Sequence, residues 1–443
     1  MRQVVVKTKL GLIEGVREDG CIVFKGIPYA KPPIGDLRFS APKPLAPFEG
    51  IYKADHFGNR SPQTEWDLPD NFFKKEFYSD SIYATPIDED CLYLNIWVPD
   101  KEVTEKLPVA FYIHGGAFSG GTGHELEFRT NAYAKRDVIL VTINYRCGLL
   151  GFFAHPWVYE EDAAACGNYG ILDQIAALNW VRDNIAEFGG DADNITIFGQ
   201  SAGAISVQTL LSSTYTKGKF SKAIIQSGGG YPKILDEDIT LDEAFTFGNR
   251  IVELSGVSSL YELRKLPMEK ILQLQKQIVA EVMQAGKGLI YKPVMNGYVV
   301  EDSYDNLAAG GRTHDVPVMI GSTRHDITVT EKEAKECNSR LQQGCLGWSL
   351  MQEKLGRKPA YVYYFKRCMP GDNAGAFHSA ELWYMFGTLK NCWRPLTDKD
   401  YELSEKMLDY WTNFMKKGNP NSINLPEWKP CSEKNPFVME FDV

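Results

Sequence analysis

The chain has 443 residues, of which 44% are hydrophobic and 24% are charged, and its formal net charge is −9. This composition is typical of a globular protein with enough apolar mass for a large core. The negative charge, together with the lack of a Lys- or Arg-rich block, argues against nucleic acid or an anionic membrane as the main partner.

The N-terminal segment MRQVVVKTKLGLIEG alternates around a central glycine, which predicts a small β hairpin. Its apolar run is too short for a secretory signal peptide, and no stretch approaches the roughly 18 apolar residues that a membrane span requires. The nine cysteines are scattered, with no C-x-x-C pair, and no His, Asp and Glu cluster has metal-ligand spacing. We therefore expect a cytoplasmic protein that has no membrane partner and needs no metal or organic cofactor.

Short β-branched or aromatic runs then alternate with helical patterns. The predicted strands are residues 92–99, 109–115, 138–145, 195–199, 222–228, 316–321 and 361–365, and the predicted helices are 170–188 and 201–213. Several strands are apolar on both faces, as in a parallel sheet covered by helices. The alternation predicts one α/β domain over residues 1–443 with a large, mostly parallel central sheet. Residues 231–290 and 327–358 lack this rhythm and are expected to form cap-like helical excursions.

A glycine-rich loop, FYIHGGAFSGG, occupies residues 111–121 after one of these strands. A phosphate-binding loop is one interpretation, although the G-K-[ST] ending of a P-loop is missing, and a plain flexible turn is another. In α/β-hydrolases a loop of this type supplies backbone N–H donors to an oxyanion hole. The loop favours such a hole if a nucleophile follows at a neighbouring strand end.

The segment FGQSAGA, residues 198–204, places Ser201 in the pattern G-x-S-x-G. It follows an apolar run and opens a helical pattern, which is the strand–turn–helix order of a nucleophile elbow. Gly199 and Gly203 relieve crowding in so sharp a turn, and the helix N-terminus brings a partial positive charge near developing negative charge. The alternative is a serine that caps the helix N-terminus, which is a common role. The order of the elements favours the nucleophile.

A serine nucleophile needs a base, and the α/β-hydrolase fold orders these residues as Ser, Asp or Glu, then His. His314 precedes a predicted strand and so lies at the wrong end of the sheet. His325 is adjacent to Asp326, and neighbouring side chains point apart. His378 lies in a loop beyond the last predicted strand and before a helical pattern, although a surface or helix-capping histidine is the alternative. His378 is the predicted base, and Asp326 its orienting carboxylate.

The chain resembles the type-B carboxylesterases, the family of cholinesterases, liver carboxylesterases and bacterial para-nitrobenzyl esterases. The similarity runs through most of the length, with the longest matching blocks at residues 24–44, 88–99, 167–204 and 375–388. This resemblance implies the α/β-hydrolase fold and the triad Ser201, Asp326 and His378. It also implies an oxyanion hole formed by the N–H groups of Gly116, Ala117 and Ala202, and a serine close to the triad at Ser227.

The chain departs from the family pattern at several positions. Asp326 stands where the family usually has glutamate, and it lies only 52 residues before His378, so we expect a more open passage to the site. Gln200 replaces the usual glutamate beside the nucleophile. Ser61 replaces the cysteine that bridges to the position of Cys91 in secreted relatives, which is consistent with a cytoplasmic location.

These features predict a serine carboxylic-ester hydrolase that acts through an acyl-enzyme on neutral, small to medium esters, with a small-molecule ester as its partner. Two alternatives remain open. An acyltransferase would use the same acyl-enzyme with an alcohol acceptor, and a non-catalytic binding module would resemble relatives that have lost a triad member.

Overall fold

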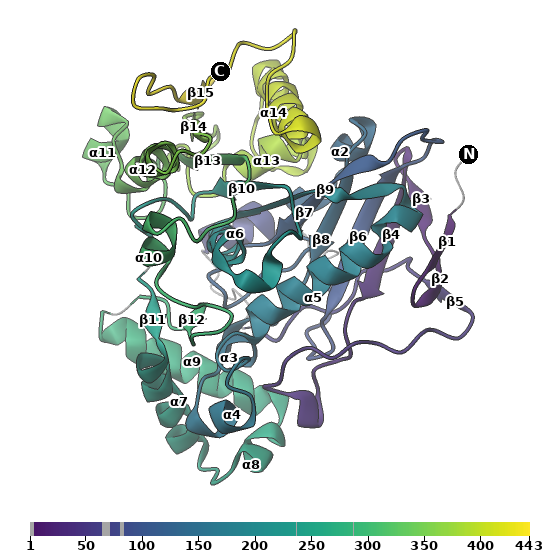
Figure 1. Cartoon of the computed structure of the whole chain (residues 1–443), viewed down its shortest axis with the longest axis vertical. Coiled ribbons are helices and arrows are strands. Elements are labelled where there is room, and N and C mark those ends of the chain that lie inside the picture. The colour runs from purple at the N-terminus through teal and green to yellow at the C-terminus, as the bar shows by residue number, and fades with distance from the viewer. Residues whose placement is uncertain (1–3, 64–70, 80–83, 236, 287) are drawn as a thin grey trace.

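The computed structural model describes residues 4–63, 71–79, 84–235, 237–286 and 288–443. A ten-stranded sheet runs through this part of the chain (Figure 1). Its spatial order is β15 (Met439–Phe441), β14 (Tyr361–Phe365), β13 (Val318–Thr323), β10 (Lys222–Gln226), β9 (Gly190–Gln200), β7 (Leu107–Ile113), β8 (Ile139–Ile143), β6 (Tyr93–Pro99), β4 (Cys21–Pro28) and β3 (Val16–Glu18). Neighbours from β15 to β8 are parallel, and β6, β4 and β3 extend the edge in antiparallel pairs. The predicted large, mostly parallel sheet is confirmed.

Both faces of the central part of this sheet are buried, and the strands from β14 to β4 contribute to two cores. In β7, Val109, Phe111 and Ile113 pack into one apolar cluster, whereas Ala110 and Tyr112 pack into the other. Because no face of these central strands meets water, their sequences are continuous apolar runs without a polar alternation.

Helices cover each face of the sheet. One core contains side chains of α5 (Tyr169–Asn184), α6 (Ala202–Ser212) and α12 (Arg340–Lys354), and the opposite core contains those of α2 (Ala132–Lys135), α13 (Glu381–Met385) and α14 (Asp398–Lys417). The two helices expected at 170–188 and 201–213 are α5 and α6. The remaining helices are α1 (Phe72–Phe77), α3 (Gly148–Phe152), α4 (Pro156–Glu161), α7 (Leu241–Ser255), α8 (Leu260–Arg264), α9 (Met268–Gln284), α10 (Tyr304–Ala309) and α11 (Glu331–Glu336).

The N-terminal hairpin is also present. Strands β1 (Val5–Thr8) and β2 (Gly11–Glu14) pair antiparallel, and β5 (Ile51–Lys53) adds to β2 in a separate three-stranded sheet. Gly11 has a φ of 125°, which a residue with a side chain rarely adopts. Glycine is therefore needed where the second strand begins.

The two segments without the strand–helix rhythm differ from one another. Residues 231–290 contain the short strand β11 (Ile239–Thr240), which pairs with β12 (Val294–Met295), followed by α7, α8 and α9. In Figure 1 these three helices gather at the end of the molecule opposite α14. Residues 327–358 contain α11 and α12, and α12 buries Trp348 against the sheet core, so much of this segment covers the sheet.

In the part of the chain that the structure describes, no helix combines the length and the apolar character that a membrane crossing requires.

Candidate active site

The predicted site residues follow neighbouring strands of the sheet. Ser201 follows β9, Ser227 follows β10, Asp326 lies just past β13, and His378 lies in the loop after β14. The glycine-rich loop follows β7. Because these strands are parallel neighbours, their carboxyl ends open on one edge, where ligands bind in open α/β sheets. The topology thus gathers residues that lie far apart in the sequence.

Ser201 sits in a strained turn between β9 and α6. Its φ is 59° and its ψ is −125°, a combination that residues with side chains rarely adopt. Its N–H donates to the Gln226 carbonyl at 2.9 Å, and its own carbonyl accepts from the N–H groups of Ala204 at 2.9 Å and Ile205 at 3.0 Å. The Ser201 side chain makes no capping hydrogen bond to α6. The helix-cap interpretation therefore lacks its defining contact.

Glycines allow the surrounding backbone to approach this turn. A Cβ at Gly203 would lie 2.0 Å from the Ile113 carbonyl oxygen, and one at Gly199 would lie 2.5 Å from the Gly203 carbonyl oxygen. A Cβ at Gly115, in the loop after β7, would lie 2.9 Å from the Gln200 carbonyl oxygen. Any side chain at these positions would collide with backbone, so the glycines bring the loop, the strand and the helix together around Ser201.

His378 and Asp326 form a buried pair. The distance from His378 Nδ1 to Asp326 Oδ1 is 2.5 Å, and the two side chains are 7% and 0% exposed. Asp326 also accepts hydrogen bonds from the N–H groups of Thr323 at 3.0 Å and Ile327 at 2.8 Å. Burial by itself would raise the pKa of Asp326, but the interaction with His378 and the backbone N–H donors hold that pKa below its usual value. The ionised carboxylate fixes the His378 tautomer with the proton on Nδ1.

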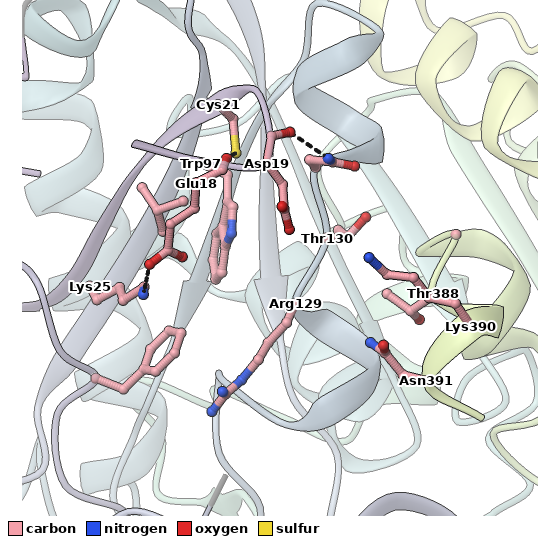
Figure 2. Close-up of a pocket in the computed structure, with 14 residues that line it drawn as sticks. Glu18, Asp19, Cys21, Lys25, Trp97, Arg129, Thr130, Thr388, Lys390 and Asn391 are labelled. Carbon is pink, nitrogen blue, oxygen red and sulfur yellow. Dashed lines mark hydrogen bonds and ion pairs between the residues drawn. The ribbon is translucent and has the colours of Figure 1, made fainter. Parts of the chain in front are cut away.

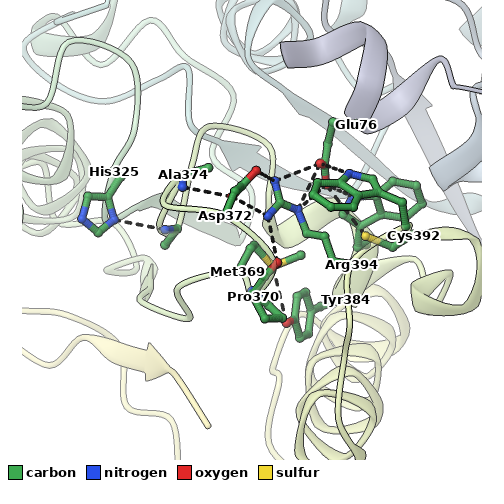
Figure 3. A network of polar contacts seen from close by, with 12 residues as sticks. Glu76, His325, Met369, Pro370, Asp372, Ala374, Tyr384, Cys392 and Arg394 are labelled. Atoms are coloured by element: carbon green, nitrogen blue, oxygen red, sulfur yellow. Dashed lines mark hydrogen bonds and ion pairs between the residues drawn. The ribbon is translucent and has the colours of Figure 1, made fainter.

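The other two histidines after Ser201 have different roles. The backbone N–H of His325 donates to the Ala376 carbonyl at 2.9 Å, and its Nδ1 accepts from the Ala376 N–H at 3.0 Å (Figure 3). His325 thereby ties the loop after β13 to the loop that carries His378. His314 lies before β13, where its Nε2 is 3.0 Å from the Ser213 carbonyl oxygen. Neither histidine takes the place of His378 beside the carboxylate.

The side chain of Gln200 is hydrogen-bonded to Nε2 of His378, the ring nitrogen that does not face Asp326. The Gln200 amide nitrogen lies 3.1 Å from His378 Nε2, and Gln200 is buried. Because Nδ1–H is directed to Asp326, Nε2 accepts this bond and the amide donates it. Among the described residues, Ser201 makes no hydrogen bond to His378. Contacts of this kind often tighten only when substrate is bound.

Ser227 connects the buried pair to a second carboxyl group. Its hydroxyl is hydrogen-bonded to Asp326 and lies 3.5 Å from Glu381 Oε1. Burial, with the charge of Asp326, raises the pKa of Glu381 to about 7. Two acids so close together cannot both ionise freely in a buried site. The ionised member of the two is therefore Asp326, and the position predicted for Ser227 beside the pair agrees with the structure.

The glycine-rich loop presents free N–H groups beside Ser201. Gly116 has a φ of 102° and Ala117 a φ of 54°, so the chain turns sharply there. Gln63 fixes the loop, since its Oε1 accepts from the Gly121 N–H at 2.8 Å and its Nε2 donates to the Gly121 carbonyl at 3.1 Å. Within the described residues, the N–H groups of Gly116, Ala117 and Ala202 have no hydrogen-bond acceptor. They are available to a ligand oxygen.

A pocket of about 140 Å³ joins these groups. Ser201, Gln200, His378 and the loop at 115–117 form one part of its lining. The rest of the lining is mostly aromatic and apolar, with Phe73, Phe77, Tyr78, Tyr112, Phe128, Ile327 and Leu382, and it includes Glu125, Glu127 and Ser379. No described residue of 231–290 lines this pocket, so the α7–α9 helices are not part of its wall.

Helix α1 contributes Phe73 and Phe77 to the pocket lining, and the buried carboxylate of Glu76 holds this helix in place. Glu76 accepts hydrogen bonds from Trp383 Nε1 at 3.0 Å, from Trp393 Nε1 at 2.8 Å and from Arg394 Nε at 3.0 Å. Arg394 also pairs with Asp372 at 2.7 Å, which completes the network in Figure 3. Glu76 and Arg394 are both buried. Segments distant in sequence thus hold Phe73 and Phe77 in the pocket wall.

A second cavity of about 260 Å³ lies beside the edge strands β3 and β4 (Figure 2). It is lined by polar groups, including the ion pair of Lys25 with Glu18, and by the buried ring of Trp97. Its one thiol belongs to Cys21, whose pKa burial raises to about 12, so this thiol is a poor nucleophile. This cavity is larger, but the first pocket is the one lined by Ser201 and His378.

Sequence reasoning missed several residues of the site. Gln63 and Glu76 lie in segments remote from every motif, and no local pattern distinguishes them. Tyr112, Glu125 and Glu127 also line the pocket. The two glutamates carried a usable signal, because ELEF at 125–128 alternates two acids with two apolar residues just after the glycine-rich loop.

Comparisons with known proteins identify the family of the chain. The carboxylesterase family model matches residues 2–345 and 347–443. A para-nitrobenzyl esterase of Bacillus subtilis is 31% identical over 97% of this chain and 93% of its own length. A solved para-nitrobenzyl esterase structure superposes with a TM-score of 0.85 at 29% identity, covering 100% of this chain and 96% of that one. A carboxylesterase of Geobacillus stearothermophilus gives a TM-score of 0.79 at 31% identity, over 99% and 96% of the two chains. The chain therefore belongs to the carboxylesterase family and is a serine carboxylic-ester hydrolase with the α/β-hydrolase fold.

Proposed function

We propose that Ser201, His378 and Asp326 are the catalytic triad of this esterase. His378 Nε2 removes the proton as Ser201 Oγ attacks the ester carbonyl, and the alcohol leaves with that proton. Water, activated by the same nitrogen, then releases the acid from the acyl-enzyme. Asp326 holds the imidazole in the tautomer that leaves Nε2 as the acceptor.

The observation that carries this proposal is the buried His378–Asp326 pair. His378 lines the same pocket as Ser201, whose backbone is strained. The 2.5 Å contact and the low exposure of both side chains make the pair a fixed base, and a backbone strain such as that of Ser201 is usually found at functional sites. Gln200 must release Nε2 before the proton transfer. A rotation of its side-chain amide is enough for that.

We infer that the N–H groups of Gly116, Ala117 and Ala202 form the oxyanion hole. They lack an acceptor among the described residues, and the glycines of the turn bring their loop against Ser201. Donors fixed before the reaction stabilise the developing charge without reorganisation, and one such donor is typically worth 10²- to 10³-fold in kcat.

The pocket supports neutral esters with small to medium groups as substrates. Its volume is about 140 Å³, which limits the size of the groups that it can hold. Its lining is largely aromatic, so a charged group would lose its hydration on entering the pocket. Hydrolysis is the outcome whenever water reaches the acyl-enzyme. The whole chain, residues 1–443, acts as a single domain in this proposal.

The test of the triad is covalent labelling. An organophosphate or a sulfonyl fluoride should inactivate the protein stoichiometrically, and mass spectrometry should place the adduct on Ser201. Short-chain nitrophenyl esters should be hydrolysed before, and not after, labelling. An adduct on another residue, or full activity in Ser201→Ala, would contradict the assignment.

We also propose a cytoplasmic, thiol-reduced protein. All nine cysteines are free. Ser61 has no thiol that could form a disulfide with Cys91, and its Oγ accepts a hydrogen bond from the Cys147 N–H at 3.0 Å. Reductant should therefore change neither the melting temperature nor the activity. A disulfide at Cys91 in a non-reducing peptide map of the native protein would contradict this prediction.

A further inference from the structure

Two glutamates and two tyrosines form a polar cluster in the pocket, here called the carboxyl wall. Tyr78, Tyr112, Glu125 and Glu127 are its members, and all four line the pocket that contains Ser201. The wall stands among aromatic side chains. The mechanism of ester cleavage gives it no role.

One oxygen of the Glu125 carboxylate accepts two hydrogen bonds. Its Oε1 accepts from the Tyr78 hydroxyl at 2.6 Å and from the Thr122 N–H at 3.0 Å. The carboxyl of Glu127 is hydrogen-bonded to the carboxyl of Glu125. Two carboxyl groups can bond in this way only when they share a proton, so Glu127 donates and Glu125 accepts.

Two other polar atoms of the wall have no partner. Glu127 Oε2 and the Tyr112 hydroxyl oxygen are buried, and apart from the contact between the two carboxyl groups neither makes a hydrogen bond within the described residues. Glu127 is 1% exposed and Tyr112 is 0% exposed. Buried polar groups are normally paired, and an unpaired one in a native structure calls for an explanation. Both atoms belong to residues that line the same pocket, so a ligand in that pocket can pair with them.

The chemistry of the two atoms limits the ligand. Glu127 Oε2 has lone pairs that accept a hydrogen bond, whereas the Tyr112 hydroxyl donates one. A single hydroxyl group donates and accepts at once, so it satisfies both atoms. An ammonium group only donates and a carbonyl group only accepts, and each would leave one atom unpaired.

We propose that the carboxyl wall recognises a hydroxyl group on the ester substrate, which donates to Glu127 and accepts from Tyr112. The inference rests on the proposed function, since it concerns the substrate that the triad cleaves. Such recognition would make this enzyme selective for hydroxylated neutral esters over otherwise identical esters without the hydroxyl group.

The electrostatics of the wall agree with an uncharged ligand. Burial raises the pKa of Glu127 well above its usual value, and the neighbouring Glu125 raises it further. Burial also raises the pKa of Glu125. Near neutral pH the pair therefore retains a proton and attracts a cation only weakly, whereas a cation entering among Phe73, Phe77 and Phe128 would lose its hydration.

The test compares matched esters that differ by one hydroxyl group. 4-Hydroxybutyl acetate is compared with butyl acetate, and methyl 3-hydroxybutanoate with methyl butanoate, so that the hydroxyl group is placed on the alcohol side or on the acyl side. The readout is the ratio of kcat/KM within each pair. We expect a preference for the hydroxylated ester of roughly three- to tenfold in at least one pair, the range of one or two net neutral hydrogen bonds.

Variants then assign the preference to the wall. Tyr112→Phe removes the donor, and Glu127→Met removes the acceptor at similar side-chain length, so each should bring the ratio close to one. Glu127→Gln retains a carbonyl oxygen for the ligand and an N–H donor for Glu125, and it should retain most of the preference. Tyr291→Phe is the matched control, because the Tyr291 hydroxyl is also buried and unpartnered but does not line the pocket.

Several outcomes would overturn the inference. These are equal kcat/KM in both pairs for the wild type, an unchanged ratio in Tyr112→Phe, an equal loss in Tyr291→Phe, or a preference for the cationic 4-(dimethylamino)butyl acetate over the hydroxylated ester. Hydrolysis of 4-nitrophenyl acetate through Ser201 would in those cases leave the proposed function intact. Loss of hydrolysis of every ester would contradict both proposals together.

Discussion

The two sides of the pocket are built by different means. On the catalytic side, Ser201 is positioned by backbone: its own turn bonds to Gln226, and glycines let Ile113 approach to a distance that excludes any Cβ at Gly203. On the opposite side, α1 is positioned by the side chain of Glu76, which is bonded to Arg394 and to indole N–H groups. One side depends on backbone contacts between neighbouring strands and their loops, and the other depends on side-chain hydrogen bonds.

This difference separates reactivity from selectivity. A geometry held by backbone tolerates few changes, because any side chain at the close approaches displaces the nucleophile. A wall held by side chains can change its shape through substitutions that leave the turn untouched. We therefore expect variants of the catalytic side to change kcat, and variants of the α1 side to change KM and stability.

The largest expected effect belongs to the catalytic side. Asp326→Asn removes the carboxylate that fixes the His378 tautomer, so kcat should fall by roughly 10⁴-fold while the melting temperature changes little. His325→Ala is the control one residue away, because His325 bonds to Ala376 and not to the catalytic pair. It should cost far less activity, and the reverse ranking of the two variants would refute the role of Asp326.

On the α1 side, Glu76→Gln leaves the buried Arg394 with only Asp372 as a charged partner. Breaking a buried ion pair typically costs 3–5 kcal/mol, and the second pair should keep the loss near the lower end. We expect a lower midpoint in urea unfolding and a higher KM, with kcat nearly unchanged.

Lys9→Gln serves as the control for Glu76→Gln, because Lys9 pairs with Asp183 on the surface, where both side chains are more than half exposed. Its cost should stay below about 1 kcal/mol. Equal losses in the two variants, or a loss of kcat in Glu76→Gln, would remove the distinction between the two sides of the pocket.

A third effect concerns the buried acid behind the triad. Burial raises the pKa of Glu381 from 4.5 to about 7, so the folded chain binds a proton that the unfolded chain releases between these pH values. The resulting stability is fully present below pH 4.5 and is lost as pH rises to about 7, by about 3 kcal/mol in all. Glu381→Gln cannot release this proton, so its free energy of unfolding should fall less between pH 5 and pH 7.5. Parallel curves for variant and wild type would rule this account out.

The smallest expected effect is at Gln200. Its amide lies 3.1 Å from His378 Nε2, and a carboxylate there would favour the protonated imidazole. Gln200→Glu should therefore move the acid limb of the kcat/KM profile to higher pH. The wild type should prefer 3,3-dimethylbutyl acetate to its cationic isostere acetylcholine, and the variant should narrow that gap, since a nearby charge is worth about 1 to 4 kcal/mol. A wild-type preference for acetylcholine would contradict the neutral-ester proposal.

The sequence predicted the parts of the molecule that rest on local pattern. The β9–Ser201–α6 turn followed from glycine spacing, since only glycine permits backbone contact on both sides of a sharp turn. The choice of His378 over His314 and His325 followed from strand order, because parallel strands deliver their carboxyl ends to one edge. The strands of the central sheet were visible as apolar runs because both of its faces are buried.

Contacts between segments that share no sequence pattern became visible in the folded structure alone. The bond from Gln200 to His378 depends on side-chain rotamers, and the bond from Glu76 to Arg394 joins residues more than 300 positions apart. The carboxyl wall needed the fold as well, because Glu127 and Tyr112 are unpaired only once burial has removed water from them. The proposed reacting groups, and the sheet edge where they meet, could be predicted from the sequence because they follow from backbone geometry. The shape and polarity of the pocket follow from long-range packing, which no local pattern encodes.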